Sequence, residues 1–185
     1  MFDFSTFPIL TTERLRLREI TKDDLEGLIA LFSSEESMRF LNSPPVTNEE
    51  EARATVERFA GEFRRQEAIE WAITLQGDDR LIGRCGSGDW KKPDRRIDVG
   101  WTVVPALWGR GYATEAAREM IGWLFTNLDL HRIQADCTDG NIASERVMQK
   151  CGFKYEGTWR ESSWEHGRFV DIKQFGLLRR EFRPG

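Results

Sequence analysis

The segment from residue 97 to residue 125, IDVGWTVVPALWGRGYATEAAREMIGWLF, constrains the fold of this 185-residue chain more than any other. It opens with an apolar run rich in β-branched residues, Val99 to Val104, which predicts a strand that ends before Pro105. A short loop with two glycines follows. From Ala113 onward the apolar residues recur at the spacing of an amphipathic helix. The predicted order is therefore strand, glycine-bearing loop, helix.

This order suits the binding of an anion. The first N–H groups of a helix lack acceptors within the helix, and the helix dipole places partial positive charge at the same end. Gly109, Gly111 and the small Ala113 let a bulky group approach the backbone closely. A phosphate or pyrophosphate is the natural ligand of such a turn. Arg110 adds a mobile cation beside it.

Three other interpretations of the loop were considered. The glycines can serve an ordinary tight connection between strand and helix, and this interpretation stays open on the glycines alone. A dinucleotide-binding turn needs G-x-G-x-x-G, but the third glycine position is Thr114. A phosphate-binding P-loop needs G-x-x-x-x-G-K-[ST], which this segment does not contain.

Residues 108 to 113, WGRGYA, resemble motif A of the GNAT superfamily of acyl-CoA-dependent N-acyltransferases, written [QR]-x-x-G-x-[GA]. Trp108 departs from the first position, but the longer run WGRGYATEA is similar to the RimJ/RimL branch, which commonly has tryptophan there. Residues 141 to 153, NIASERVMQKCGF, resemble motif B of the same branch. Two motifs in the expected order support each other, and the resemblance extends over roughly residues 10 to 180.

The resemblance implies a fold, a cosubstrate and a set of site residues. The cosubstrate is acetyl-CoA, and Asn141 corresponds to a residue that hydrogen-bonds its pantetheine arm. Ser144 holds the position of a general acid near the CoA sulfur. From the residues alone, Asn141 is a helix cap and Ser144 a surface serine. The implied cofactor-binding residues are Val103, Val104, Trp108, Gly109, Arg110, Gly111, Tyr112, Ala113, Thr114, Asn141 and Ser144.

Acetyl transfer to an amine needs a free amine, a donor for the developing oxyanion and a proton for the leaving thiolate. The resemblance places the oxyanion donor at a backbone N–H around Val103. Asp98 lies where many family members have a carboxylate base, although an ion pair with Arg95 or Arg96 explains it equally well.

A second possible base in the family lies beyond motif B. Some ribosomal-protein acetyltransferases use a glutamate there, and that position aligns with Ser163 in this chain. The base is therefore missing at that position. Glu161 is two residues out of register, and a water relay remains open. His166, next to Gly167 in a predicted turn, is more typical of a solvated turn residue.

The whole chain predicts an α+β protein with a GNAT fold. We expect a mixed central sheet of about six to seven strands flanked by about four helices, in a single domain over residues 1–185. Helices are predicted after Thr21, after Thr47 or Asn48, from Ala113, and at about residues 142–150. The predicted strands cover residues 12–19, 70–75, 81–86, 99–104, 132–137, 153–159 and 169–178.

Composition narrows the functional classes. Hydrophobic residues at 39% and charged residues at 31% are typical of a globular protein. The net charge of −4 argues against a nucleic-acid partner, and no apolar stretch is long enough to span a membrane. The first ten residues lack the basic region of a secretory signal. Three widely spaced cysteines and two histidines predict no metal site, and reduced thiols predict a cytoplasmic protein.

Three functional hypotheses follow. The first is an N-acetyltransferase, monomeric or homodimeric, whose acceptor is a protein α-amine or a small-molecule amine. The second is a non-catalytic acyl-CoA-binding sensor, motivated by the missing glutamate base. The third is a nucleotide-dependent oxidoreductase in which Asp136 or Asp139 binds a ribose. The broken glycine spacing and the 96 residues before the strand–loop–helix unit count against the third.

Overall fold

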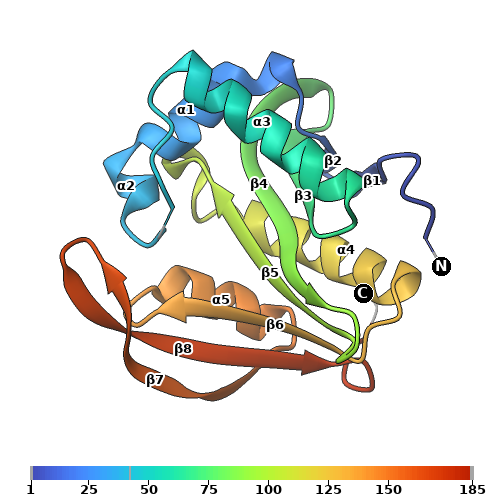
Figure 1. Cartoon of the computed structure of the whole chain (residues 1–185), viewed down its shortest axis with the longest axis vertical. Coiled ribbons are helices and arrows are strands. Elements are labelled where there is room, and N and C mark those ends of the chain that lie inside the picture. Colours follow the sequence, from blue (N-terminus) through green and yellow to red (C-terminus); the bar gives the residue numbers. More distant parts are fainter. Residues whose placement is uncertain (1, 42, 184–185) are drawn as a thin grey trace.

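A computed structural model describes residues 2–41 and 43–183. The fold is one mixed sheet of eight strands in the order β1-β2-β3-β4-β5-β6-β8-β7, flanked by helices (Figure 1). The strands are β1 (Leu10–Thr11), β2 (Leu15–Glu19), β3 (Ile69–Leu75), β4 (Asp78–Lys91), β5 (Arg96–Val103), β6 (Arg132–Thr138), β7 (Lys154–Glu165) and β8 (Arg168–Leu178). The helices are α1 (Leu25–Ser33), α2 (Glu35–Met38), α3 (Glu49–Arg64), α4 (Tyr112–Asn127) and α5 (Ile142–Lys150).

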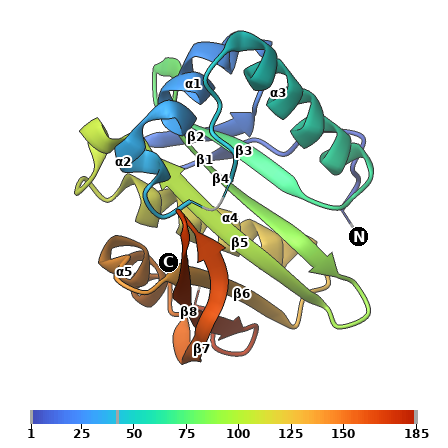
Figure 2. The ribbon, with the colours of Figure 1, turned by 60° about the vertical axis from the view of Figure 1, so that its left-hand side comes forward.

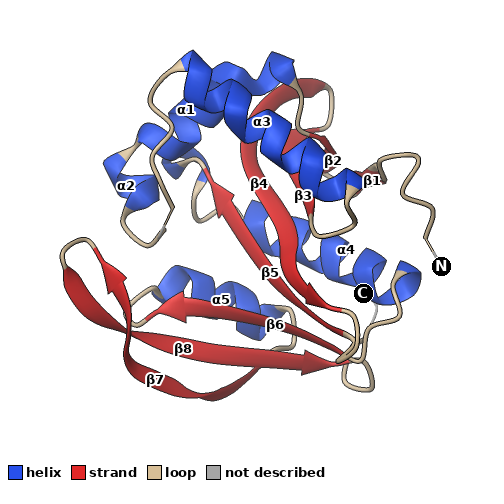
Figure 3. Ribbon diagram, viewed as in Figure 1, coloured by secondary structure: helices blue, strands red, loops and turns tan. Residues whose placement is uncertain are grey.

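The centre of the sheet holds its one parallel pair among the described strands, β5 and β6. Helix α4 links them, as a crossover connection between parallel strands requires. The two strands pair over only three positions, the last of which joins Asp98 to Gln134. Beyond that pair they diverge, as Figure 3 shows. We call the space between β5 after Asp98 and β6 after Gln134 the wedge.

Helices cover both faces of the sheet. α4 and α5 pack on one face, where Met120 and Leu124 of α4 and Met148 of α5 join the larger hydrophobic cluster. The predicted apolar stripe of α4 is buried as expected. α1 and α3 pack on the other face in a second cluster, which includes Phe32 and Phe59. In Figures 1 and 2 the β7–β8 hairpin rises from the far end of the sheet toward the side of α2.

The fold confirms the predicted class. Among the described residues the sheet has eight strands and there are five α-helices, whereas the sequence predicts about six to seven strands and about four helices. β1 has two residues and α2 has four, so neither is long enough to show a hydrophobic period. β4 and β7 also run further than predicted, because each contains a register shift, between Gly88 and Lys91 and between Trp159 and Ser163. Such bulges interrupt the alternation of side chains that marks a strand.

Several predicted boundaries agree with the structure. Asn48 caps α3 by accepting a hydrogen bond from the Glu51 N–H, and α5 covers residues 142–150 as predicted. Residues 166–167 join β7 to β8, within the predicted turn at His166 and Gly167. No helix in the described part of the chain has the length and apolarity needed to cross a membrane.

Candidate functional site

The glycine loop before α4 is built on two left-handed residues. Gly109 has φ of +74° and Gly111, the N-cap of α4, has φ of +83°. Residues with a Cβ rarely adopt the left-handed region, so glycine at these two positions lets the backbone take this conformation without strain. No side chain of the described residues caps α4. Its first N–H groups therefore have no side-chain acceptor among the described residues.

A side-chain network fixes this loop to the start of the sheet. Glu115, in the first turn of α4, accepts hydrogen bonds from the Thr12 hydroxyl at 2.5 Å and the Arg14 backbone N–H at 3.0 Å. The Arg14 guanidinium forms an ion pair with Glu115 at 2.5 Å and donates to the Arg110 carbonyl at 3.0 Å. It also lies 4.8 Å from the centre of the Tyr112 ring. Arg14 thereby neutralises a carboxylate that would otherwise repel an anion at this helix end.

The backbone of β5 presents free polar groups to the wedge. The Val104 N–H donates to the Ile82 carbonyl at 2.9 Å, so even-numbered residues of β5 bond to β4 in this antiparallel ladder. Odd-numbered residues point their backbone groups the other way. The last parallel pair, Asp98 with Gln134, uses the Val99 N–H, so the N–H groups of Trp101 and Val103 are the ones that face the wedge. The predicted Val103 donor is one of these two, and Val104 is already bonded within the sheet.

A groove of about 430 Å³ continues from the wedge to the glycine loop. Most predicted cofactor residues line it, whereas Val104 and Arg110 do not. The lining residues are Glu36, Ser37, Phe40, Leu41, Trp101, Thr102, Val103, Leu107, Trp108, Gly109, Gly111, Tyr112, Ala113, Thr114, Asn141, Ala143, Ser144, Arg146, Val147 and Lys150.

Trp108 binds the last residue of β5 through its side chain. Its indole N–H donates to the Val103 carbonyl at 2.6 Å, while the ring stays 48% exposed beside the groove. This bond gives a physical role to the residue that departs from the motif, because it holds the loop against the strand that it follows.

The start of α5 forms the opposite wall of the groove. Asn141 caps this helix by accepting a hydrogen bond from the Ser144 N–H at 3.1 Å. Within residues 2–41 and 43–183, neither the Asn141 amide nitrogen nor the Ser144 hydroxyl has a protein partner. Both groups are thus available to a ligand in the groove. Arg146 and Lys150 add two cations on the same wall.

Three carboxylates border the wedge on the face opposite α4. Burial raises the pKa of Asp98 above its ordinary value of 3.8, and the negative charges of Asp89 and Asp136 add to the shift. Partial desolvation and the charge of Glu165 raise the pKa of Asp136 in the same way. Glu165 is buried and accepts a hydrogen bond from the Thr138 hydroxyl at 2.8 Å.

The structure also tests the alternative role of Asp98. Arg95 pairs with Asp129, and Arg96 donates to the Gln134 side chain at 3.1 Å. In the described part of the chain Asp98 has no ion-pair partner, and its Oδ1 is buried without a hydrogen bond. The expected pairing with Arg95 or Arg96 is therefore absent from the structure.

Sequence reasoning missed one wall of the groove and most of the loop network. The wall is formed by Glu36, Ser37, Phe40 and Leu41, in and just after the four-residue α2. Ser37 is only 6% exposed and its hydroxyl lacks a partner among the described residues. Glu161 and His166 both adopt positive φ in β7 and its turn, and neither lines the groove. No group of His, Cys, Asp and Glu in the described ranges is arranged to hold a metal ion.

The family model described as "Acetyltransferase (GNAT) domain" matches residues 14–154. The chain belongs to the GNAT acetyltransferase family. It is 32% identical over 173 residues to the uncharacterized N-acetyltransferase YoaA of Bacillus subtilis, covering 94% of this chain and 98% of YoaA. It is 31% identical to the uncharacterized N-acetyltransferase p20 of Bacillus licheniformis, over 94% of this chain and 97% of p20.

Solved structures agree with this assignment. The GNAT acetyltransferase from Bacillus anthracis superposes with a TM-score of 0.83 at 26% identity, over 94% of this chain and 100% of that one. RimL, a ribosomal L7/L12 α-N-protein acetyltransferase in complex with coenzyme A, gives a TM-score of 0.85 at 19% identity, over 92% and 98%. The latter shows a shared fold. The GNAT chain is thus an acyltransferase that uses acetyl-CoA.

The loop network yields a prediction for this GNAT enzyme. Replacing Arg14 by methionine leaves the Glu115 charge unpaired at the N-terminus of α4 and releases the Arg110 carbonyl. We expect the Kd for acetyl-CoA to rise about fivefold, because a charge near a helix end contributes about 1 kcal/mol. Isothermal titration measures this, and the matched control is Arg80→Met, which removes an exposed cation far from the groove. Equal effects of the two changes would remove Arg14 from the account.

Proposed function

We propose that the enzyme transfers the acetyl group of acetyl-CoA to a primary amine by direct attack in a ternary complex. The observation that supports this most is the wedge, where the backbone N–H groups of Trp101 and Val103 face a space that leads to the glycine loop. The loop and the start of α4 receive the pyrophosphate. Arg110 in the loop, and Arg146 and Lys150 in the lining of the groove, add positive charge. Asn141 donates to the pantetheine arm.

Direct attack fits the state of the thiols. An acyl-enzyme route would need an activated nucleophile such as a thiolate. All three cysteines are free, and burial raises the pKa of Cys137 to about 12 and that of Cys151 to about 11. Burial raises the pKa of Cys85 as well. These thiols stay protonated near neutral pH. Free thiols also suit the proposed cytoplasmic location. We propose that the enzyme is a monomer or a homodimer.

The chemistry then runs in one sequence. A base takes a proton from the ammonium, and the free amine attacks the thioester carbonyl, forming the C–N bond. The Val103 N–H donates to the oxygen as negative charge develops on it. As the C–S bond breaks, the attacking nitrogen releases its second proton to water, and Ser144 gives its proton to the departing sulfur before regaining one from solvent. The products are an N-acetylated amine and CoA.

We assign the base to Asp98, with Asp136 as the alternative that the structure adds. Asp98 lies at the apex of the wedge, and Asp136 is the next residue of β6 with its side chain on the same face. A base must be deprotonated, so the raised pKa of Asp98 predicts an acidic limb of kcat/KM above 3.8 that Asp98→Asn abolishes. The pH–rate profile measures this. If Asp136→Asn alone removes the limb, Asp136 is the base.

Ser144→Ala tests the proposed acid. The helix cap uses the Ser144 backbone N–H, so the substitution keeps the cap intact. We expect kcat to fall by about 100-fold with little change in the Kd for CoA, because a positioned proton donor contributes about this factor. Rapid thiol-release assays and CoA titration measure the two quantities. An unchanged kcat would refute the acid role.

The acceptor is proposed as a protein N-terminal α-amine or a small-molecule amine. RimL is an α-N-protein acetyltransferase, whereas MccE, a neighbour with a TM-score of 0.83, is a microcin C7 self-immunity acetyltransferase solved with acetyl-CoA and AMP. The competing function is a non-catalytic acyl-CoA sensor, which the missing glutamate at Ser163 favours. Acetyl-CoA binding without thiol release on any amine would support the sensor.

A further inference from the structure

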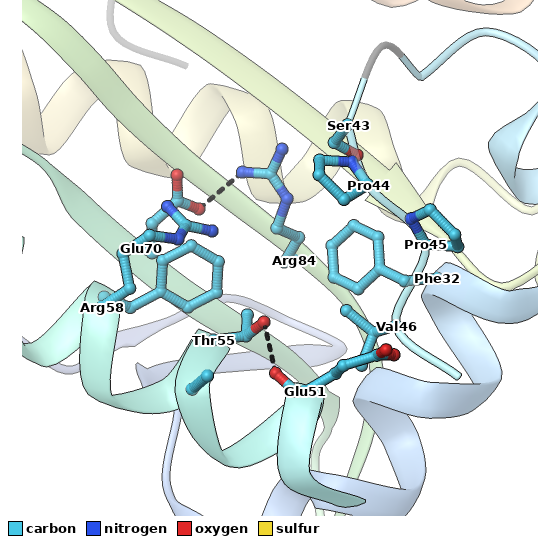
Figure 4. Close-up of a pocket in the computed structure, with 12 residues that line it drawn as sticks. Phe32, Ser43, Pro44, Pro45, Val46, Glu51, Thr55, Arg58, Glu70 and Arg84 are labelled. Atoms are coloured by element: carbon cyan, nitrogen blue, oxygen red, sulfur yellow. Dashed lines mark hydrogen bonds and ion pairs between the residues drawn. The ribbon is translucent and has the colours of Figure 1, made fainter. Parts of the chain in front are cut away.

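A second pocket of about 430 Å³ lies on the face of the sheet covered by α1 and α3 (Figure 4). Its walls are mostly apolar and come from three elements: Phe32 of α1, the segment 43–46 before α3, and Phe59 of α3. The floor is different, because it carries the charged side chains of Glu70 on β3 and Arg84 on β4. An apolar cavity with one charged end suits an amphipathic small molecule.

The Glu70–Arg84 pair at the floor of the pocket is held in place by the residues around it. Arg84 Nη1 and Glu70 Oε2 lie 2.6 Å apart, with side chains only 20% and 12% exposed. Glu70 lies opposite Gly86 on β4, where a Cβ would approach Glu70 Oε2 to 2.2 Å. Glycine at residue 86 thus leaves the space in which the Glu70 carboxylate lies. Carboxylate and guanidinium are held in one orientation as a result.

This orientation leaves part of the guanidinium unused. Glu70 bonds through Nη1, while Arg84 Nε is buried and has no acceptor within residues 2–41 and 43–183. In Figure 4 Glu70 lies on one side of the guanidinium, and its other nitrogens point toward the side of Ser43 and Pro44. A buried donor without an acceptor is unfavourable, and a carboxylate seated at this end of the pocket would supply the acceptor.

The remaining charges of the pocket are already matched. Glu51 accepts from the Thr47 N–H at 2.7 Å, which holds it at the start of α3. Arg58 pairs with Glu62 at 3.0 Å. Among the described residues, Arg84 is therefore the lining residue of this pocket that still offers an unpaired buried donor.

The pocket and the acyl-CoA groove are neighbours. Arg84 is the strand partner of Thr102, which lines the groove on β5. The chain after α2 contributes Phe40 and Leu41 to the groove and residues 43–46 to the pocket. The Arg84 backbone therefore lies about one strand spacing, roughly 5 Å, from the strand that borders the wedge.

We infer that this pocket is the carboxylate end of the acceptor site, and that the acceptor is an amino-acid-like molecule with a primary amine and a carboxylate on an apolar body. The inference rests on the proposed acetyl transfer and specifies its acceptor class. Arg84 receives the carboxylate, the walls receive the apolar body, and the amine extends toward the wedge.

The test compares carboxylates with matched carboxamides. The probes are L-leucine, L-phenylalanine, 4-aminobutyrate and 6-aminohexanoate, each with its carboxamide, assayed for thiol release from acetyl-CoA. We expect at least one carboxylate to exceed its carboxamide by tenfold or more in kcat/KM. Arg84→Met should abolish this preference without changing the Kd for acetyl-CoA, whereas Arg80→Met on the same strand should retain it. Glu70→Leu with Arg84→Met replaces the pair by apolar groups if the single variant unfolds.

The outcomes separate this inference from the proposed function. Acetylation of carboxylates and carboxamides with equal kcat/KM, or a preference that survives Arg84→Met, would overturn the pocket assignment and leave acetyl transfer intact. Acetyl-CoA binding with no turnover of any carboxylate probe would also overturn it. Failure of acetyl-CoA itself to bind would instead refute the proposed function.

Discussion

Gly111→Trp should abolish acetyl-CoA binding, raising the Kd by at least about 100-fold. Gly111 is the N-cap of α4 at φ of +83°, and its backbone borders the free N–H groups that receive the pyrophosphate. An indole at this position occupies the space of the phosphates and approaches Arg14, whose Nη2 lies 3.5 Å from an added Cβ. A tryptophan held at this positive φ also strains the backbone, which costs about 1–3 kcal/mol in conformational energy. Isothermal titration with acetyl-CoA measures the loss.

The matched control for this substitution is Gly77→Trp. Gly77 has φ of +80° in the turn between β3 and β4, and nothing lies within 4 Å of an added Cβ. It carries the same backbone strain far from the groove. We expect both variants to keep their circular dichroism spectra, and only Gly111→Trp to lose the ligand. Wild-type affinity in Gly111→Trp would show that the loop does not bind the cofactor.

Trp71→Ala should have the largest effect on stability, lowering the free energy of unfolding by about 3–5 kcal/mol. Trp71 is fully buried on β3, and its indole N–H donates to the Pro8 carbonyl at 2.8 Å. Its ring packs edge-on against Trp123 of α4 and Phe7 of the N-terminal segment. Truncation therefore removes contacts that join strand, helix and N-terminus, and leaves a cavity among them.

Denaturant unfolding of Trp71→Ala, with Trp159→Ala as the control, measures this effect. Trp159 is 62% exposed on β7, so its loss should change stability by no more than about 0.5 kcal/mol. These two tryptophans cannot be ranked from the sequence, because both lie in predicted strands and burial depends on what packs above each face. Similar destabilisation by both changes would contradict the described core.

Local patterns predicted those parts of the fold that depend on neighbours in sequence. The period of α4, the glycine loop before it and the Asn141 cap of α5 all rest on residues within a few positions of one another. The strand–loop–helix unit and motif B therefore led to the GNAT fold. The four-residue α2 offered no such pattern, although it forms a wall of the groove.

Features that depend on distant residues could not be predicted. Glu115 and Arg14 are separated by 101 positions, and nothing local indicates that they meet. The end of β5–β6 pairing at Asp98 and Gln134 is likewise a property of the whole sheet. The acidic environment of Asp98, to which Asp136 contributes, and the Glu70–Arg84 pair became visible only once neighbouring strands were in register.

Acetyl-CoA-dependent transfer is tested most directly by thiol release from acetyl-CoA over a panel of primary amines, with Gly111→Trp and Ser144→Ala beside the wild-type enzyme. The account predicts release of CoA and formation of an N-acetylated amine by the wild type. It also predicts no release by Gly111→Trp and about 100-fold slower release by Ser144→Ala. Tight acetyl-CoA binding with no amine-dependent release by the wild type would contradict the account and indicate an acyl-CoA sensor.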